Sequence, residues 1–413
     1  MLSKSIKNCR LCNGNKLEKI LKLVPTPAGN NFLTKKEKLD PEPKFPLELY
    51  FCKDCSHIQL GELVDPYHLF KNYHFVSGTS KVNIDHFEKY ADEMISKFNL
   101  KKNSFILDIG SNDGTCLKAF KSRGMRVLGV DPADNIAEVA NDNGIETICD
   151  FFNKDLAKKI KKKYGIPNLI TSHNVLAHVD DFSGVIQSVS NLMGKETIFV
   201  FEVGYFKEVF KNLWFDTIYH EHLDYHTVKP LKLFFEKLNM ILFDVEVKDV
   251  QGGSIRNYVQ LAESQYKIES SVDKLISQEL LVGLHDTKKL KTFQSRIEKI
   301  KKELSETLLS LKKNKKSIVG YGAPTKSTTL LNFFEIDSNF IDYIVDDNPL
   351  KQEKFSPLLH IPIKSSESLF SNQHPDYIII LAWNFADSII DKIRTMNFKG
   401  KYIIPLPKVT IKD

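Results

Sequence analysis

The segment 104–120 constrains the fold of this chain more strongly than any other. Its sequence, SFILDIGSNDGTCLKAF, reads as a buried strand at 105–109, a glycine turn and the start of a helix. Gly110 and Gly114 allow the backbone to turn sharply and to approach a ligand closely, because glycine has no side chain. A continuous apolar strand followed by a helix is typical of a parallel α/β sheet. The segment therefore predicts an α/β domain with a ligand at this turn.

An acid ends each of the first two predicted strands. Asp108 ends the first strand, and residues 125–132 form a second apolar strand whose acid, Asp131, comes 23 positions later. Asp108 can face a ligand amino group, and Asp131 is placed to accept hydrogen bonds from ribose hydroxyls. The turn lacks the glycine spacing of a dinucleotide fingerprint, which disfavours a NAD-type cofactor. It resembles the first motif of class I methyltransferases, so we expect S-adenosylmethionine as the cofactor.

Three further residues are candidate contacts of this cofactor. Asn112 lies within the glycine turn, Phe151 follows the third predicted strand and could flank the adenine, and Asn174 ends the fourth strand at 169–175. The carboxyl ends of parallel strands are where ligands bind in such sheets. The remaining strands of this sheet are expected at 198–203, near 240–248 and near 254–262.

Two CxxC pairs near the start of the chain predict a structural zinc site. Cys9 and Cys12 form one pair, and Cys52 and Cys55 form the other. Each pair places two thiolates on one tight turn, and two such turns supply the four sulfurs of a tetrahedral Zn²⁺ site. Because all four ligands are cysteines, the ion keeps no open position for catalysis. Disulfides are the weaker alternative for a chain expected in a reducing compartment.

The segment 218–225 concentrates polar chemistry. It holds Tyr219, Glu221 and His222 among its two histidines, two acids and two tyrosines. A polar loop or helix start is the plain alternative, and metal binding is a weaker one because HExxH spacing is missing. The segment follows the fifth strand, so it can reach the cofactor face. His178, in NVLAHV, is expected near the same face, with a packing role as its alternative.

These motifs together resemble the sugar C-methyltransferases of deoxysugar biosynthesis, which act on nucleotide-linked 4-keto sugars. The resemblance covers nearly the whole chain and is carried by these stretches: CRLC, FCKDC, LDIGSNDGT, NVLAHV, YHEHLDYH, GGSIRNYV, GYGAPTKSTTLLN and YIVDDNPLKQEKFSPLLHIPI. It implies a zinc-binding N-terminal domain, a central methyltransferase domain and a Rossmann-like C-terminal domain. The implied substrate is a dTDP- or other NDP-linked keto sugar.

The resemblance also implies residue roles. His222 resembles the general base that removes a proton beside the ketone. Tyr219, Glu221 and His178 resemble the residues that orient the sugar and stabilise the enolate, and Tyr73 resembles a further family tyrosine. From its place beside His222, Glu221 could also orient the His222 ring and stabilise its charged form. A sugar carbon becomes a nucleophile only after it loses such a proton, which requires a base and hydrogen-bond donors. Methylation of an oxygen or nitrogen of a similar sugar, which needs no ketone, is the alternative.

Length and composition fit a protein of several domains. The 413 residues are 42% hydrophobic and 27% charged, so we expect zinc-binding (1–75), methyltransferase (76–262) and C-terminal Rossmann-like (263–413) domains. The net charge of +6 comes from scattered residues, which argues against a nucleic-acid-binding protein. No apolar run is long enough for a membrane span, and the start lacks a signal peptide, so we expect a cytoplasmic protein without a membrane partner.

Two features of the last third leave alternatives open. Apolar residues spaced by three and four from Leu290 to Leu311 predict one helix packed on the flanking domains, or a coiled-coil seam; we expect a monomer or weak homodimer. The turn at 316–329 reads as a strand, a glycine turn and a helix start, with Lys326 as a point charge for a phosphate. A domain that only packs, or a NAD site, are the alternatives there.

Overall fold

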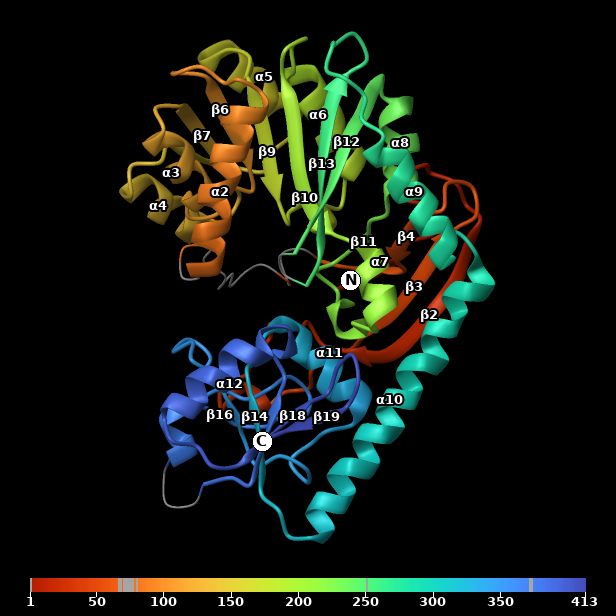
Figure 1. The fold of residues 1–413 in the computed structure, drawn as a ribbon, viewed down its shortest axis with the longest axis vertical. Helices are drawn as coiled ribbons and strands as arrows, with labels where there is room; N and C mark the ends of the chain where they lie inside the picture. The colour runs from red at the N-terminus through yellow and green to blue at the C-terminus, as the bar shows by residue number, and fades with distance from the viewer. Residues whose placement is uncertain (1, 66–68, 70–77, 79–80, 250–251, 371–373) are drawn as a thin grey trace.

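The computed structural model describes residues 2–65, 69, 78, 81–249, 252–370 and 374–413. Its largest sheet has seven strands in the order β12-β13-β10-β9-β6-β7-β8, and Figure 1 shows this sheet in the upper part of the molecule. All neighbouring strands from β8 to β10 are parallel, and β13 is antiparallel to both β10 and β12. The strands are β6 (Phe105–Ile109), β7 (Arg126–Asp131), β8 (Thr147–Cys149), β9 (Leu169–His173), β10 (Ile198–Gly204), β12 (Met240–Lys248) and β13 (Ser254–Leu261).

Helices cover both faces of this sheet. The parallel strands consist mainly of buried apolar residues because helices cover both of their faces. One face packs on α2 (Lys81–Lys97), α3 (Thr115–Ser122) and α4 (Asp134–Asp142). The other face packs on α5 (Lys154–Tyr164), α6 (Phe182–Leu192), α8 (Val228–Lys237) and α9 (Ser271–Val282). The result is a three-layer α/β/α domain whose strand order reverses between β6 and β9, the position where such sheets bind ligands.

A second sheet joins the start of the chain to the central part. Its order is β11-β4-β3-β2, and a separate pair links β1 (Ser3–Ser5) to β5 (Glu62–Val64). The strands are β2 (Leu17–Thr26), β3 (Phe45–Cys52), β4 (Ile58–Leu60) and β11 (Asp224–Tyr225). Since β11 follows the segment that holds His222, that segment is anchored on the N-terminal sheet. Short elements beside it are η3 (Leu176–His178), α7 (Phe206–Asn212) and η4 (Phe215–Thr217).

The C-terminal part is a second, smaller α/β unit in the lower half of Figure 1. Its sheet has the order β16-β15-β14-β17-β18-β19, parallel except for the pair β18 and β19. The strands are β14 (Ile318–Tyr321), β15 (Ile344–Val345), β16 (Ile363–Lys364), β17 (Tyr377–Ile380), β18 (Lys401–Ile404) and β19 (Thr410–Lys412). Its helices are α11 (Thr325–Phe334) and α12 (Ala386–Thr395), with the short turns η5 (Ser366–Phe370) and η6 (Trp383–Phe385). The short turn η1 (Glu37–Leu39) lies near the start of the chain.

The helix α10 (Thr287–Lys313) runs along one side of the molecule and connects its parts (Figure 1). The predicted stripe from Leu290 to Leu308 is buried, in one cluster with residues of β2, α7 and α11. Phe293 contacts the ring of Phe210 in α7. The stripe therefore serves packing inside the chain, as the first of the two interpretations expects. The division at 75/76 and 262/263 stays a prediction.

No helix in the part of the chain that the structure describes combines the length and apolarity of a membrane span.

Candidate active site

Four cysteine thiols converge at the start of the second sheet. Cys9 Sγ lies 3.6 Å from Cys55 Sγ, Cys12 Sγ lies 3.5 Å from Cys52 Sγ, and all four sulfurs lie within 4.8 Å of one another. A tetrahedron with Zn–S bonds of about 2.3 Å has sulfur–sulfur edges of about 3.8 Å, so the donor set fits Zn²⁺. Each pair is followed by a residue with positive φ, at Asn13 (60°) and Ser56 (68°), which turns the chain back around the thiols.

The predicted cofactor acids lie side by side at the carboxyl ends of β6 and β7. Asp108 is buried, its Oδ1 has no hydrogen-bond partner among the described residues, and burial together with Asp131 holds its pKa well above the ordinary range. Burial also raises the pKa of Asp131, whose oxygens accept from the amides of Asn112 (2.9 Å) and Ala133 (3.0 Å). A buried carboxylate oxygen without a donor is costly. Asp108 therefore fits a site that receives a cationic amino group.

The glycine turn has the backbone geometry that its sequence predicts. Gly110 has a φ of 72° and Gly114 a φ of 77°. A Cβ at Gly110 would lie 2.2 Å from Val175 Cγ2, and one at Gly114 would lie 2.9 Å from the Ile145 side chain. The space beside each glycine is thus filled by the protein itself. These positions require glycine for the turn and for tight packing, whereas the expected approach to a ligand stays a prediction.

Two other cofactor candidates lie around the same edge of the sheet. Phe151 is 67% exposed, which leaves its ring free to stack, whereas its neighbour Phe152 is buried in the core and is not available. Asn174, with a φ of 56°, donates its amide to the Glu202 carbonyl at 2.8 Å. Gly78 donates its amide to Asp113 Oδ2 at 2.9 Å, which brings residue 78 onto the glycine turn. The predicted Tyr73 lies outside the described residues.

The segment after η4 brings the predicted catalytic residues together. The Tyr219 hydroxyl lies 2.8 Å from His222 Nε2, and the Thr217 carbonyl accepts from His222 Nδ1 at 2.9 Å. With the proton on Nδ1, Nε2 carries the lone pair. The ring of His178 stands edge-on to that of His222, with centroids 4.8 Å apart. Burial lowers the pKa of His222 to about 4 and that of His178 to about 3, so both rings are neutral at pH 7.

Glu221 does not orient His222, which corrects the expected pairing of these two neighbours. Its carboxylate accepts from Asn30 Nδ2 at 3.0 Å, and Thr325 Oγ1 donates to Asn30 Oδ1 at 2.7 Å. The two neighbouring side chains have different partners, since His222 bonds to Thr217 and Tyr219 while Glu221 bonds to Asn30. Burial raises the pKa of Glu221 to about 7, although Asn30 and Lys351 oppose the rise. Glu221 therefore belongs to the junction of the N-terminal, central and C-terminal parts.

Comparison with known families divides the chain in the same order as the sheets. A zinc binding domain family matches residues 9–70, a methyltransferase domain family matches 83–241, and a C-methyltransferase C-terminal domain family matches 249–407. C-methyltransferase NovU of Streptomyces niveus is 32% identical over 404 residues, which are 98% of this chain and 96% of that protein.

The chain belongs to the C-methyltransferase family. It is an S-adenosylmethionine-dependent enzyme with a zinc-binding domain. The family does not support the alternative of oxygen or nitrogen methylation.

Solved structures resemble parts of this C-methyltransferase. An S-adenosylmethionine-dependent methyltransferase from Clostridium acetobutylicum is 13% identical with a TM-score of 0.35, and covers 44% of this chain and 93% of that chain. The magnesium protoporphyrin IX methyltransferase from Synechocystis, with bound S-adenosylmethionine, is 10% identical with a TM-score of 0.34, and covers 46% and 86%.

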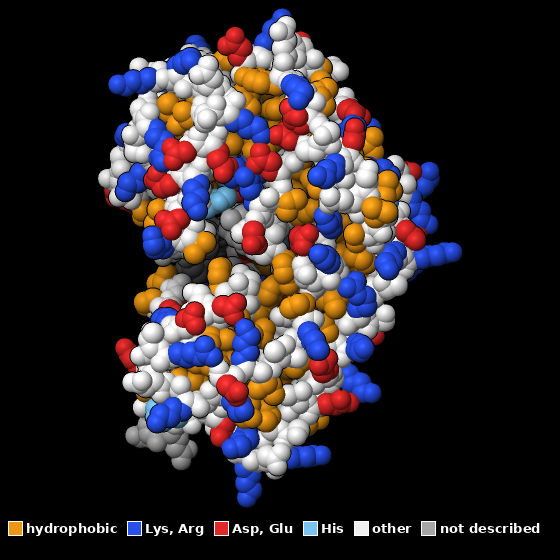
Figure 2. All heavy atoms as spheres, in the orientation of Figure 1, with side chains coloured by type: hydrophobic (Ala, Val, Ile, Leu, Met, Phe, Trp, Pro, Cys, Tyr) orange, Lys and Arg blue, Asp and Glu red, His pale blue; other side chains and the backbone are white. Residues whose placement is uncertain are grey.

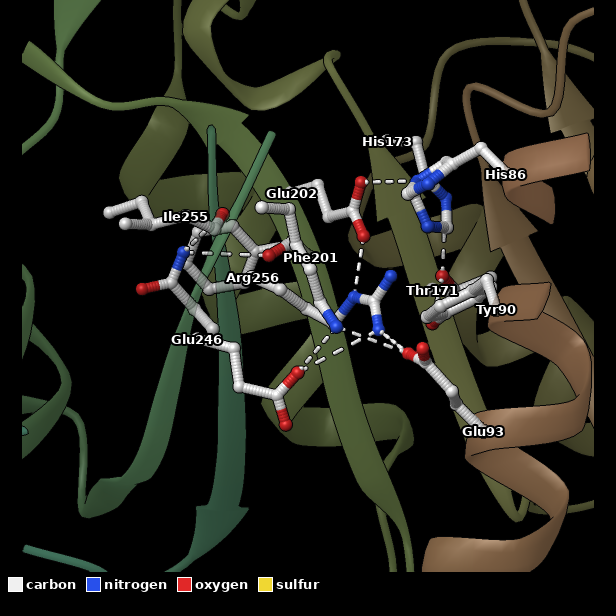
Figure 3. Close-up of polar contacts among 12 residues, drawn as sticks. His86, Tyr90, Glu93, Thr171, His173, Phe201, Glu202, Glu246, Ile255 and Arg256 are labelled. Carbon is white, nitrogen blue, oxygen red and sulfur yellow. Dashed lines mark hydrogen bonds and ion pairs between the residues drawn. The ribbon is translucent and has the colours of Figure 1, made fainter. Parts of the chain in front are cut away.

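An ionic network that no local sequence motif predicts lies beside the cofactor acids of this C-methyltransferase (Figure 3). Arg256 Nε on β13 lies 2.5 Å from Glu202 Oε1 on β10, and Glu202 Oε2 lies 2.8 Å from His86 Nε2 on α2. Burial works to raise the Glu202 pKa, but His86, His173 and Arg256 outweigh it and hold that pKa below its ordinary range. Arg256 also pairs with Glu93. The network fixes α2 across the carboxyl ends of β9 and β10.

His173 completes this edge of the sheet. It ends β9, and its Nε2 has no hydrogen-bond partner among the described residues. Its ring packs on Tyr90, with centroids 4.6 Å apart, and Figure 3 shows it beside His86. Burial lowers the pKa of His173 to about 4. Arg256 lies in the stretch GGSIRNYV, which was a signal for the family, but its partner Glu202 follows no local pattern.

The helix that follows the C-terminal glycine turn contacts the central part directly, since Thr329 Oγ1 donates to the Ile218 carbonyl at 2.9 Å. Figure 2 shows a hollow between the two halves of the molecule. Lys326 lies over the Trp383 ring at 3.6 Å, donates to Asn384 Oδ1 at 2.7 Å, and stands 4.0 Å from Asp216 Oδ2. Burial lowers its pKa to about 8. The predicted phosphate charge is therefore engaged within the protein, and a phosphate there stays a prediction.

Proposed function

We propose that this C-methyltransferase methylates a carbon next to the ketone of a nucleotide-linked keto sugar, with His222 as the base. The observation that supports this most is the environment of His222 Nε2. Its other ring nitrogen donates to Thr217, so the lone pair is on Nε2, which points at the Tyr219 hydroxyl. A neutral imidazole in that tautomer accepts a proton, whereas the same ring pointing its N–H outward would not.

The rings around His222 suit a proton transfer from carbon. The C–H bond beside the ketone breaks, its proton goes to His222 Nε2, and its electron pair becomes an enolate. The Tyr219 hydroxyl, which loses its acceptor when Nε2 takes the proton, then donates to the enolate oxygen. His178, 4.8 Å away between centroids, lies where it can orient the sugar. A donor placed for a developing oxyanion acts strongly in a buried site.

The residues at the carboxyl ends of β6 and β7 would hold the cofactor. S-adenosylmethionine supplies an electrophilic methyl group when it is bound. Asp108 would receive its amino group, because its buried Oδ1 has no donor among the described residues. Asp131 would accept from the ribose, and the exposed Phe151 ring would cover the adenine. Asn112 and Asn174 shape the backbone of the two turns that border this space.

The low pKa of His222 changes the expected pH dependence. An imidazole of pKa about 6.5 would lose its base form below pH 6, whereas His222, at about 4, keeps its lone pair throughout the working range. Glu221, by contrast, has a pKa of about 7. Because Glu221 lies at the junction of the three parts, we assign it to substrate orientation and not to proton abstraction.

Mass spectrometry of a nucleotide-sugar panel tests this proposal. The panel contains dTDP-, UDP- and GDP-linked 4-keto sugars, each with its 4-hydroxy counterpart, incubated with S-adenosylmethionine carrying a ¹³C methyl group. We expect one methyl gain on at least one keto sugar, with a ¹³C shift typical of a methyl on carbon, and none on the 4-hydroxy partners. Methylation of a hydroxyl, or of no keto sugar, would contradict it.

A further inference from the structure

The zinc turn touches the segments that carry both active-site histidines. Arg10 stands in the sequence between the predicted ligands Cys9 and Cys12, and its guanidinium bonds to residues outside the cysteine cluster. Its Nε lies 3.1 Å and 3.2 Å from the two oxygens of Asp224, two residues after His222. Both groups are shielded, since the Arg10 side chain is 5% exposed and that of Asp224 is fully buried.

The other nitrogens of the Arg10 guanidinium bond to the segment that follows His178. Arg10 Nη2 donates to the carbonyls of Val179 at 2.5 Å and Asp180 at 2.7 Å, and Nη1 lies 3.3 Å from Asp180 Oδ1. Val179 follows His178 directly. One planar fork therefore spans the backbone after one histidine and the side chain after the other, a geometry that arginine offers and lysine does not.

The second zinc turn supports the same contact. His57, two residues after Cys55, lies 2.8 Å from Asp224 Oδ1 through its Nε2. The Leu223 amide donates to the Ala177 carbonyl at 2.7 Å, and the Leu60 amide donates to the Leu223 carbonyl at 2.9 Å. Both CxxC turns thus reach Asp224, and the two histidine segments bond to each other only a residue away from each ring.

We infer that Arg10 is a positioning residue that couples the zinc site to the His178 and His222 rings. The catalytic consequence of this inference rests on the proposed function. The hydrogen bonds from Arg10 to Asp224, Val179 and Asp180, which we call the Arg10 clamp, do not depend on that function. Buried charge-assisted hydrogen bonds that share one guanidinium restrict the motion of the segments that they connect. A metal-bound turn is stiff, so the zinc site gives the two histidines a fixed reference. The zinc therefore acts on the reaction without contacting the substrate.

The test compares Arg10→Gln with Lys53→Gln by hydrogen–deuterium exchange, zinc analysis and steady-state kinetics. Lys53 holds the same place after the first cysteine of the second pair, but it is exposed and pairs with Glu18. We expect Arg10→Gln to keep its zinc and to exchange amides in 175–180 and 218–226 about 10-fold or more faster, the scale of one lost charged hydrogen bond. Lys53→Gln should leave both segments as in the wild type.

Kinetics separates the clamp from the proposed function. On the keto sugar that responds in the panel, Arg10→Gln should lower kcat by about 100-fold, the scale of a small misplacement, with little change in KM for either substrate. Arg10→Lys, which keeps the charge, should retain the fold and zinc yet still loosen 175–180. Unchanged exchange in both Arg10 variants, or zinc lost together with activity, would overturn the inference. Loosened segments in an enzyme whose turnover survives His222→Asn would contradict the proposed function alone.

Discussion

At the scale of single residues, the site depends on side chains whose burial sets their charge. Asp108, Glu221 and His222 are all shifted by desolvation towards the neutral form. Desolvation penalises whichever form is charged, so the two acids rise in pKa and the histidine falls. Burial thus favours the neutral form of each of these three groups, including the unprotonated imidazole that a proton acceptor requires.

The burial of Glu221 should make the free energy of unfolding depend on pH. Its pKa is about 7 when folded against an ordinary value of 4.5, so its protonated form favours folding. This contribution is fully present below pH 4.5 and is lost as the pH rises through 7. Glu221→Gln stays neutral, so its stability advantage over the wild type should widen by roughly 2–3 kcal/mol between pH 5 and pH 8. Urea unfolding of both proteins at both pH values measures this difference in unfolding free energy. The same difference at pH 5 and pH 8 would contradict the raised pKa of Glu221.

Asp131 provides the residue-scale test of the cofactor site. Asp131→Ala removes the proposed ribose acceptor and the acceptor of the Asn112 and Ala133 amides. We expect S-adenosylmethionine affinity to fall by roughly 1–3 kcal/mol, the value of one charged hydrogen-bonding group. Isothermal titration calorimetry measures this, with Asp142→Ala, an exposed acid at the end of α4, as the control. Equal affinities of the two variants would reject the assignment.

The predicted site residues lie in short local motifs, whereas the residues of the ionic network lie far apart in the sequence and no local pattern indicates them. The four cysteines, the strand-end acids and the pair His178 and His222 each lie in a short motif. Arg256 and Glu202 are 54 positions apart and meet only because β13 pairs with β10. Adjacency in the sequence suggests that Glu221 contacts His222, but it does not determine where the two side chains point, and Glu221 bonds to Asn30 instead.

At the scale of elements, the strands of the large sheet follow the prediction to within one or two residues. Buried parallel strands are mostly apolar runs bounded by turn residues, so the sequence predicts where each strand begins and ends. The two-residue strand β11 has no such signal, and its partner β4 lies far upstream. No pattern in the sequence therefore predicts that the segment with His222 continues into the N-terminal sheet.

The two CxxC turns provide a direct test of the proposed zinc site. The purified protein should carry about one zinc per chain, because the four thiols close a tetrahedral site. Cys52→Ser should abolish stoichiometric zinc and loosen the turn that bonds the Cys52 amide to the His57 carbonyl. Cys149→Ser, at an exposed cysteine outside the cluster, is the matched control. Full zinc content in Cys52→Ser, by plasma emission analysis, would show that another group completes the site.

At the scale of the whole molecule, one apolar cluster runs from the N-terminal sheet through α10 to the C-terminal sheet. Leu304, fully buried in this cluster, should cost about 2–5 kcal/mol of unfolding free energy when changed to Ala, the usual range for a buried leucine. Because the stripe packs inside the chain, the variant should keep the oligomeric state of the wild type. Denaturant unfolding and light scattering measure the two effects. A change of oligomeric state without loss of stability would favour the coiled-coil interpretation.

The central claim is that this C-methyltransferase makes a carbon nucleophile in its site with His222 Nε2. Solvent deuterium exchange at the substrate carbon, in D₂O without methyl donor, measures that step alone. The wild type should exchange the proton beside the ketone, while His222→Asn should bind the sugar normally and exchange it about 100-fold or more slowly, the usual scale for a general base. Exchange at the wild-type rate in His222→Asn would contradict the account and direct the same test to His178.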